Sequence, residues 1–91
     1  MTTLHMEVPV ARQTASAMSK AHADLSTSMQ TMNTQVNSLQ PDWLGNSATE
    51  FYGEYDRFRN TMNQMLEALN LLQQSLYKEI TEWENMASKL A

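Results

Sequence analysis

The chain has 91 residues, a formal net charge of −4 and no cysteine. A chain of this length forms at most one small domain, and without cysteine it has neither disulfides nor thiolate metal sites. The negative charge argues against binding to nucleic acid or to an anionic membrane surface. No apolar run approaches the roughly 20 residues that cross a bilayer, so we expect no stable membrane insertion.

Residues 9–40 are predicted to form the first helix. Pro9 suits a first helical turn, where no backbone N–H is needed, and Pro41 disfavours helical backbone at Gln40. Apolar residues in this segment step alternately by three and four, which is the heptad pattern of a packed helix. The positions are Val8, Ala11, Ala15, Met18, His22, Leu25, Met29, Met32, Val36 and Leu39.

Residues 47–90 are predicted to form the second helix. Ser47 and Glu50 match the S-x-x-E capping box that marks a helix start, and no glycine or proline follows Gly53. The heptad positions are Ala48, Phe51, Tyr55, Phe58, Met62, Met65, Leu69, Leu72, Leu76, Glu79, Trp83, Met86 and Leu90. Over both segments 21 of 23 positions are apolar in a chain that is 42% apolar, so the pattern strongly indicates helices.

Residues 41–46, Pro-Asp-Trp-Leu-Gly-Asn, join the two helices. A connection this short folds helices back antiparallel, and Gly45 can adopt the positive φ that a chain reversal needs. We therefore expect an all-α fold, with one domain over residues 1–91 that forms an antiparallel two-helix hairpin. Two helices have no third layer to cover their apolar faces, so we expect two hairpins to pair into a four-helix bundle.

A sparser apolar stripe runs beside the heptad positions of the second helix. We interpret Tyr52, Leu66 and Ile80 as the contact with a second hairpin, because they widen the apolar side of the helix. The alternative is that they flank the interface within one hairpin. The pattern does not choose between a homodimer and a heterodimer with a related hairpin.

The sequence offers little for catalysis, and we expect no enzyme, no cofactor and no metal site. It contains no nucleophile motif or phosphate-binding loop. His22 lies among apolar positions without a second ligand one turn away, so a packed residue is expected, the alternative being a pH-sensitive contact. Most of the eight methionines occupy heptad positions, as core filler or as an adaptable binding surface.

The connecting segment resembles a known family. Trp43-Leu44-Gly45, followed by the small residues Ser47 and Ala48 and the aromatic residues Phe51 and Tyr55, is similar to the turn of the WXG100 proteins, also called the ESAT-6-like family. The length, the missing cysteines and the expected hairpin agree with this family. The resemblance covers essentially the whole chain, although only the turn is specific.

The resemblance implies export by a type VII (ESX-like) secretion system that an FtsK/SpoIIIE-type membrane ATPase powers. Such proteins act as secreted effectors or as carriers and adaptors, and Trp43 and Gly45 would belong to the recognised turn. The chain would be cytoplasmic before export and would leave without a cleaved signal peptide, consistent with an N-terminus that has no basic start and no apolar stretch.

Many members carry a C-terminal Y-x-x-x-[DE] export signal. Here Tyr77 is followed at the acidic position by Thr81, with Glu82 one place late. Tyr77 and Glu82 are therefore candidates for a degenerate signal. The alternatives are that the chain lacks a signal of its own, that it uses the signal of a partner, or that it has been trimmed.

A second interpretation comes from another functional class. The chain could be a cytosolic helical adaptor, or a filament subunit similar to the needle hairpins of type III secretion, in which Trp43 only plugs the turn. Needle hairpins are similar in size but do not typically use Trp-x-Gly. A neighbouring gene for an FtsK/SpoIIIE-type ATPase would favour the first interpretation, and a basal-body operon the second.

Overall fold

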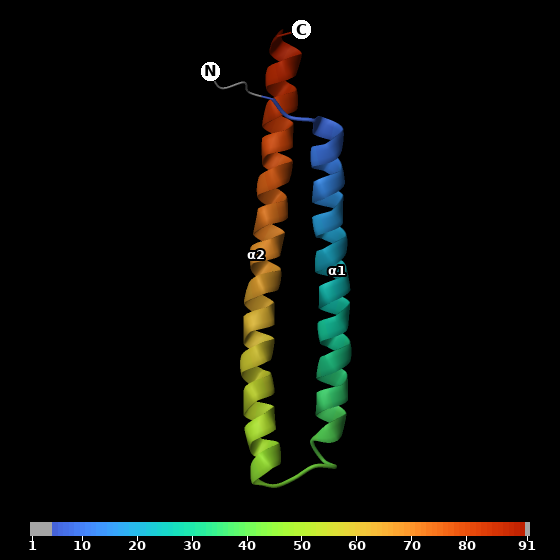
Figure 1. The fold of residues 1–91 in the computed structure, drawn as a ribbon, viewed down its shortest axis with the longest axis vertical. Helices are drawn as coiled ribbons and strands as arrows, with labels where there is room; N and C mark the ends of the chain where they lie inside the picture. The colour runs from blue at the N-terminus through green and yellow to red at the C-terminus, as the bar shows by residue number, and fades with distance from the viewer. Residues whose placement is uncertain (1–4, 91) are drawn as a thin grey trace.

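The computed structural model describes residues 5–90, with the side chain of Leu90, one of the expected heptad positions, outside the description. Over this range the chain forms two helices, α1 (Val8–Leu39) and α2 (Asn46–Leu90), joined by a short turn (Figure 1). The helices run antiparallel, so the start of α1 lies beside the last part of α2. The expected all-α hairpin is confirmed.

The end of α1 differs from the expectation in one detail. Gln40 has helical dihedral angles, φ −52° and ψ −45°, although Pro41 follows it. Its N–H donates a hydrogen bond of 3.2 Å to the carbonyl of Val36, and the N–H of Asp42 donates one of 2.9 Å to the carbonyl of Leu39. The helix still ends here, because Pro41 has no N–H to continue the ladder.

Gly45 makes the turn into α2. Its φ is +120°, a conformation that residues with a Cβ rarely adopt, and a Cβ built at this position would meet nothing within 4 Å. A glycine is therefore required here for its backbone conformation, and not because a side chain would lack space. The helix begins at Asn46, so Ser47 already lies in the first turn and is not the expected N-cap. The N–H of Thr49 instead donates to the Gly45 carbonyl at 3.0 Å.

The two helices contact each other through one line of side chains on each helix. The most buried members are Ala15 and Met29 of α1, and Ala48 and Ile80 of α2. The half-buried members of α2 repeat at the same alternating spacing of three and four: Tyr52, Tyr55, Arg59, Met62, Leu66, Leu69, Gln73, Leu76 and Trp83. We call this set the intramolecular interface.

This line corrects the expected heptad pattern on α2. Ala48, Tyr55, Met62, Leu69, Leu76 and Trp83 were assigned correctly, but the alternate positions lie one residue later along the helix. Tyr52 takes the place of Phe51, and Leu66 takes the place of Met65, which is 56% exposed. The apolar stripe of α2 is wider than one line, and a single neighbouring helix covers only part of it.

The same finding corrects the assignment of Tyr52, Leu66 and Ile80 as a separate contact stripe. All three lie in the intramolecular interface, and Ile80 is only 1% exposed within the single hairpin. A buried Ile80 has no surface left for a second chain.

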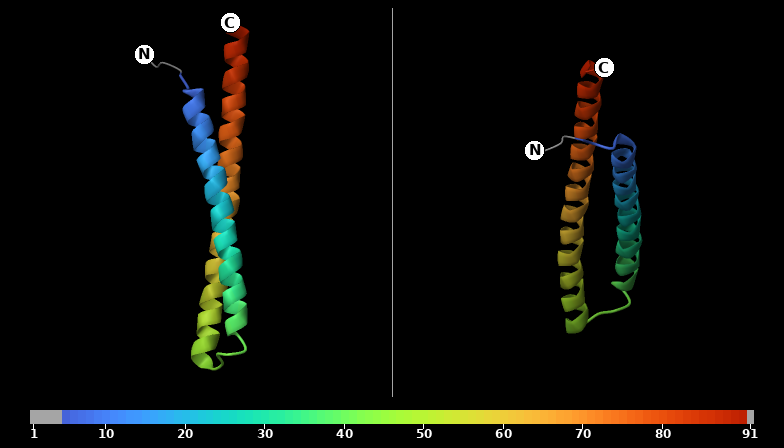
Figure 2. Two further views of the ribbon diagram at one scale, coloured as in Figure 1. Left: turned by 90° about the vertical axis from the view of Figure 1, so that its right-hand side faces the viewer. Right: turned by 45° about the horizontal axis from the view of Figure 1, so that its top comes forward.

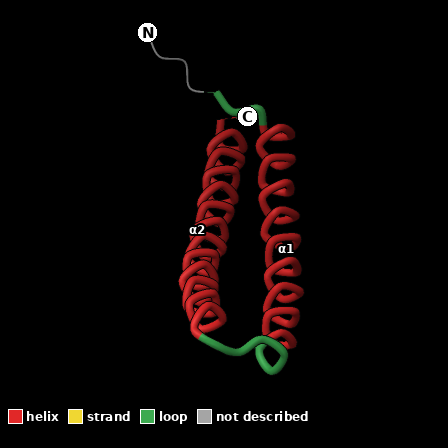
Figure 3. The backbone as a smooth tube through the Cα atoms, turned by 60° about the horizontal axis from the view of Figure 1, so that its bottom comes forward, coloured by secondary structure: helices red, strands yellow, loops and turns green. Residues whose placement is uncertain are grey.

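The hairpin is a rod only one helix pair thick. Its principal extents are 68 × 24 × 16 Å. The two helices cross at a shallow angle in the left view of Figure 2, and the turn joins them at one end only (Figure 3). α2 is longer than α1 and projects beyond it at the end away from the turn (Figure 1). Neither helix, over the residues described, is long and apolar enough to cross a membrane.

Ile80→Ala should lower the free energy of unfolding by about 2–5 kcal/mol, because it removes a buried side chain and leaves a cavity. Leu71→Ala is the control, since Leu71 is 58% exposed and its truncation should change stability by no more than about 0.5 kcal/mol. Chemical denaturation followed by circular dichroism measures both. Equal losses for the two variants would contradict the assignment of the intramolecular interface.

Candidate functional site

The turn end of the hairpin carries an aromatic cluster around Trp43. The indole centroid lies 5.5 Å from the ring of Phe51 and 5.9 Å from that of Tyr52. The Tyr52 hydroxyl donates a hydrogen bond of 3.2 Å to the Trp43 carbonyl, which ties the turn to the first turns of α2. Trp43 nevertheless remains 37% exposed, and the neighbouring Leu44 is 80% exposed. The cluster therefore holds the turn together and still presents part of the indole to solvent.

A row of half-exposed apolar side chains follows each helix beside the intramolecular interface. These eight residues, between 36% and 56% exposed, are Leu25, Met32 and Leu39 of α1, and Phe51, Phe58, Met65, Leu72 and Met86 of α2. We call them the apolar face. Glu79 interrupts it on α2, between Leu72 and Met86.

Helix geometry places both rows on one side of the hairpin. Leu25 and Met32 directly precede Ser26 and Asn33, which are half-buried residues of α1. Phe51 and Met65 precede interface residues of α2 in the same way. One residue corresponds to about 100° of rotation around a helix. Because the two helices face each other and run antiparallel, the residue one position before an interface residue points to the same side of the hairpin on both helices. The two rows therefore lie on one side of the hairpin and form one apolar surface, which Glu79 interrupts on α2.

The opposite side of the hairpin is polar. Residues one step after interface positions point to it, and they are mostly uncharged polar or acidic: Ser16, Gln30, Asn37, Thr49, Asp56, Asn63, Asn70 and Glu84. An ion pair of 2.5 Å between Arg12 and Glu84 joins the helices there. The two sides of this thin rod therefore differ sharply in polarity.

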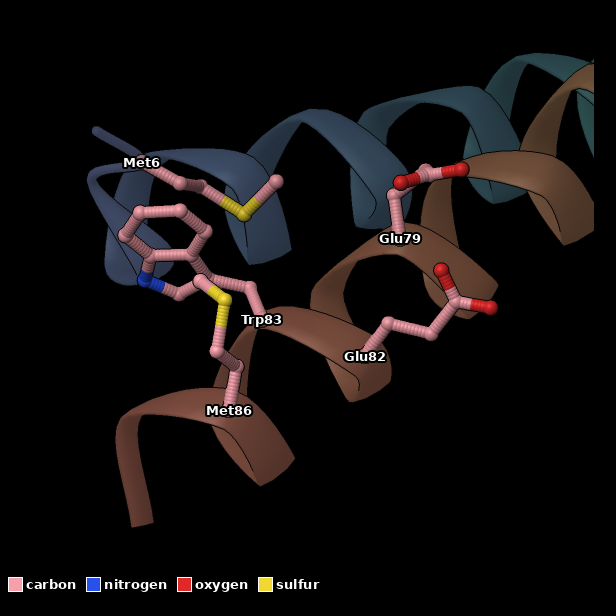
Figure 4. Close-up of a pocket in the computed structure, with 5 residues that line it drawn as sticks. All are labelled: Met6, Glu79, Glu82, Trp83 and Met86. Atoms are coloured by element: carbon pink, nitrogen blue, oxygen red, sulfur yellow. The ribbon is translucent and has the colours of Figure 1, made fainter. Parts of the chain in front are cut away.

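The far end of the hairpin, where the helix termini lie, has an open cavity of about 270 Å³ lined by Met6, Glu79, Glu82, Trp83 and Met86. We call it the terminal cavity. The side chains of Met6 and Met86 approach the indole of Trp83, and both carboxylates project to one side of it (Figure 4). The cavity thus combines an apolar wall with negative charge.

The structure separates the residues of the expected C-terminal signal. Tyr77 and Glu82 are five positions apart on α2, which corresponds to about 140° around a regular helix. Tyr77 faces the polar side, whereas Glu82 lines the terminal cavity. Oε1 of Glu82 also lies 4.0 Å from Nζ of Lys78. Thr81, one turn after Tyr77, is the position that would share its side of the helix. The turn that carries Trp43 lies at the opposite end of the rod from the last part of α2, which contains both residues (Figure 1).

Few charged side chains lie where they could form a catalytic or metal-binding centre. No cluster of three or more metal-ligating side chains occurs among residues 5–90. The pKa of Lys20 is raised by its hydrogen bond to Asp24 and by the attraction of that carboxylate, but this pair is exposed on the surface of α1. His22 is half-buried in the intramolecular interface, in line with its expected packing role.

The sequence interpretation missed the apolar face as a separate surface. Its residues were recognised as apolar heptad positions and were assigned to the contact within the hairpin. The usable signal was the width of the stripe on α2, where Phe51 and Tyr52, or Met65 and Leu66, are adjacent apolar pairs. One helix buries only one member of such a pair.

Comparison with known proteins identifies a family and no individual relative. No curated protein and no solved structure matches the chain significantly. The family model described as "WXG100: Proteins of 100 residues with WXG" matches residues 3–89, which is nearly the whole chain and includes the Trp43-Leu44-Gly45 turn. The chain therefore belongs to the WXG100 family of small helical type VII secretion substrates.

Proposed function

We propose that this protein is a non-enzymatic cargo or carrier of a type VII secretion system, exported as a pair of hairpins that meet through their apolar faces. Family membership supports the secretion route. The apolar face is the observation that supports pairing, because eight large apolar side chains on one side of a thin rod remain partly in water. The pairing surface proposed here replaces the stripe of Tyr52, Leu66 and Ile80.

The energetic argument for pairing is simple. Burying a large apolar side chain completely stabilises an association by roughly 1.5–3 kcal/mol, and eight half-exposed ones contribute about half of that each. The eight side chains of one chain thus contribute about 6–12 kcal/mol, and an equal face on the partner contributes as much again. The sum outweighs the cost of lost translational and rotational freedom, about 4–15 kcal/mol, only if most of the face is covered at once. A partner of matching length, such as another hairpin, satisfies this condition. A short peptide does not.

Recognition by the export machinery is proposed to use the turn. The half-exposed indole of Trp43 and the exposed Leu44 offer an apolar surface that is held in place by Phe51 and Tyr52. The partner during export would be the FtsK/SpoIIIE-type ATPase. The competing function, a cytosolic adaptor or filament subunit, gains no specific support from this turn.

Trp43→Ala should reduce secretion strongly and stability moderately. Since the indole is 37% exposed, its loss should cost no more than about 2–3 kcal/mol, below the roughly 3–5 kcal/mol of a fully buried tryptophan. Secreted protein is measured in a host with a type VII system. Met29→Ala, which truncates a buried side chain far from the turn, controls for stability. Equal secretion losses in both variants would show that Trp43 acts only through folding.

The C-terminal signal is tested by two substitutions in the same secretion assay. Thr81→Glu restores an acid one turn after Tyr77 and should raise export, because the tyrosine and the carboxylate then lie on one side of α2. Glu82→Ala should lower export if Glu82 serves as the displaced acid. If neither variant changes the secreted amount, this segment is not the signal, and the chain depends on a partner for it.

A further inference from the structure

We propose that the terminal cavity binds a guanidinium group, which lies against the indole of Trp83 and donates hydrogen bonds to the carboxylates of Glu79 and Glu82. The group belongs to an arginine side chain of another protein or to a small guanidinium compound. This inference goes beyond the proposed function, because it depends neither on export nor on the pairing of hairpins.

Two parts of the chain that are far apart in the sequence form the cavity. The chain just before α1 crosses α2 near the C-terminal end of that helix (Figure 1). Met6, which lies in this segment and is half-buried, lines the cavity together with Trp83 and Met86 of α2. A ligand in the cavity would therefore contact both the helix and the segment that precedes α1.

The wall around Trp83 suits a cation that is weakly hydrated. The thioethers of Met6 and Met86 approach the indole, and both carboxylates project to one side of it (Figure 4). Tryptophan is the side chain whose ring attracts cations most strongly, and thioethers adapt to the shape of a ligand. Because these groups offer no strong hydrogen-bond acceptor, a cation that holds its water shell tightly loses more against this wall than it gains.

The two carboxylates of the cavity supply the negative charge and the acceptors. Glu79 lies one turn before Trp83 on the same side of α2 and forms no ion pair within residues 5–90. The ion pair of Glu82 with Lys78, at 4.0 Å, joins two mostly exposed side chains, so it contributes little. Both carboxylates therefore keep lone pairs for hydrogen bonds from a ligand.

A guanidinium group matches this combination of walls better than other cations do. It is planar and weakly hydrated, and it carries five N–H donors at its edge that match carboxylates. A quaternary ammonium has no donor for the two acids, and Mg²⁺ or Ca²⁺ needs about six or more oxygen ligands. The volume of about 270 Å³ is below the roughly 300–1,000 Å³ of pockets for drug-sized ligands, so it suits a group the size of one side chain.

The arginines of the chain itself do not fill the cavity. Arg12 donates to Glu84 at 2.5 Å, and Arg59 pairs with Asp56 at 3.3 Å in the first half of α2. Arg57 also lies in the first half of α2, whereas the cavity lies near the end of that helix. None of the three lines the cavity. The guanidinium therefore comes from outside the hairpin.

A titration followed by NMR tests the cavity, because the two tryptophans of the chain lie in the turn and near the end of α2. N-acetylarginine methylamide carries a guanidinium and no other charge. At constant ionic strength it should shift the indole N–H resonance of Trp83 and the methyl resonances of Met6 and Met86, with a Kd of about 1–10 mM. The indole resonance of Trp43 is the internal reference and should not move.

Two related compounds show whether charge and shape are both recognised. The citrulline derivative has nearly the same shape without the charge and should bind at least about tenfold more weakly. The lysine derivative has the charge without the planar group and should bind at least about threefold more weakly. Equal binding of the arginine and citrulline derivatives, or no saturable shift of Trp83 up to about 50 mM, would overturn the inference.

The source of the guanidinium is distinguished by two further probes. Methylguanidine stands for a small compound, and a five-residue peptide of glycines with a central arginine stands for a protein. Binding of the peptide at least about tenfold tighter than methylguanidine would support an arginine of another protein, and affinities within about threefold would support a small compound. Failure of both probes to shift Trp83 would overturn the inference.

Substitution of the acids tests the assigned contacts in the same titration. Glu79→Gln combined with Glu82→Gln keeps the size of both side chains, removes both charges and should raise the Kd at least about tenfold. Glu67→Gln removes an exposed carboxylate elsewhere on α2 and should change the Kd less than about twofold. Circular dichroism verifies that both variants are folded. An unchanged Kd in the double variant would overturn the inference, since the carboxylates would then not contact the ligand.

Discussion

The whole molecule depends on the single interface that two helices can form with each other. One helix covers one line of side chains on its neighbour, and α1 covers the line that includes Tyr52, Leu66 and Ile80. The sequence of α2 supplies a wider apolar stripe than this. The row from Phe51 to Met86 is therefore left half in water, on the same side as Leu25, Met32 and Leu39. A two-helix chain with this sequence has one covered line and one uncovered surface.

This arrangement connects the fold with the proposed function. The uncovered surface runs along the rod. The turn that carries the half-exposed Trp43 lies at one end (Figure 1), and the last part of α2, with Tyr77, Glu82 and the terminal cavity, lies toward the other. One hairpin cannot bring its two ends together, because α2 is an unbroken helix between them. Two hairpins running in opposite directions would place the turn of one beside the helix end of the other, so an export receptor could read both on one surface.

Much of the fold could be predicted from the sequence because helical spacing and breaker residues are local signals. The heptad steps, Pro9, Pro41 and Gly45 placed both helices within a residue or so of their observed ends. The choice between Phe51 and Tyr52, or Met65 and Leu66, could not be predicted this way. It depends on how the two helices are rotated against each other, and both members of each pair are apolar. The burial of Ile80 and the exposure of Met65 record this rotation, and they are visible only in three dimensions.

The central claim is that the apolar face is covered in solution, and two neighbouring leucines test it most directly. Leu71 and Leu72 are 58% and 56% exposed in the single hairpin, but only Leu72 belongs to the apolar face. The measurement is the relaxation of their methyl resonances by a soluble paramagnetic agent, with the natural protein at a concentration typical for NMR. Our account predicts that the Leu72 methyl groups are strongly protected and those of Leu71 are not. Equal relaxation of both leucines would contradict it.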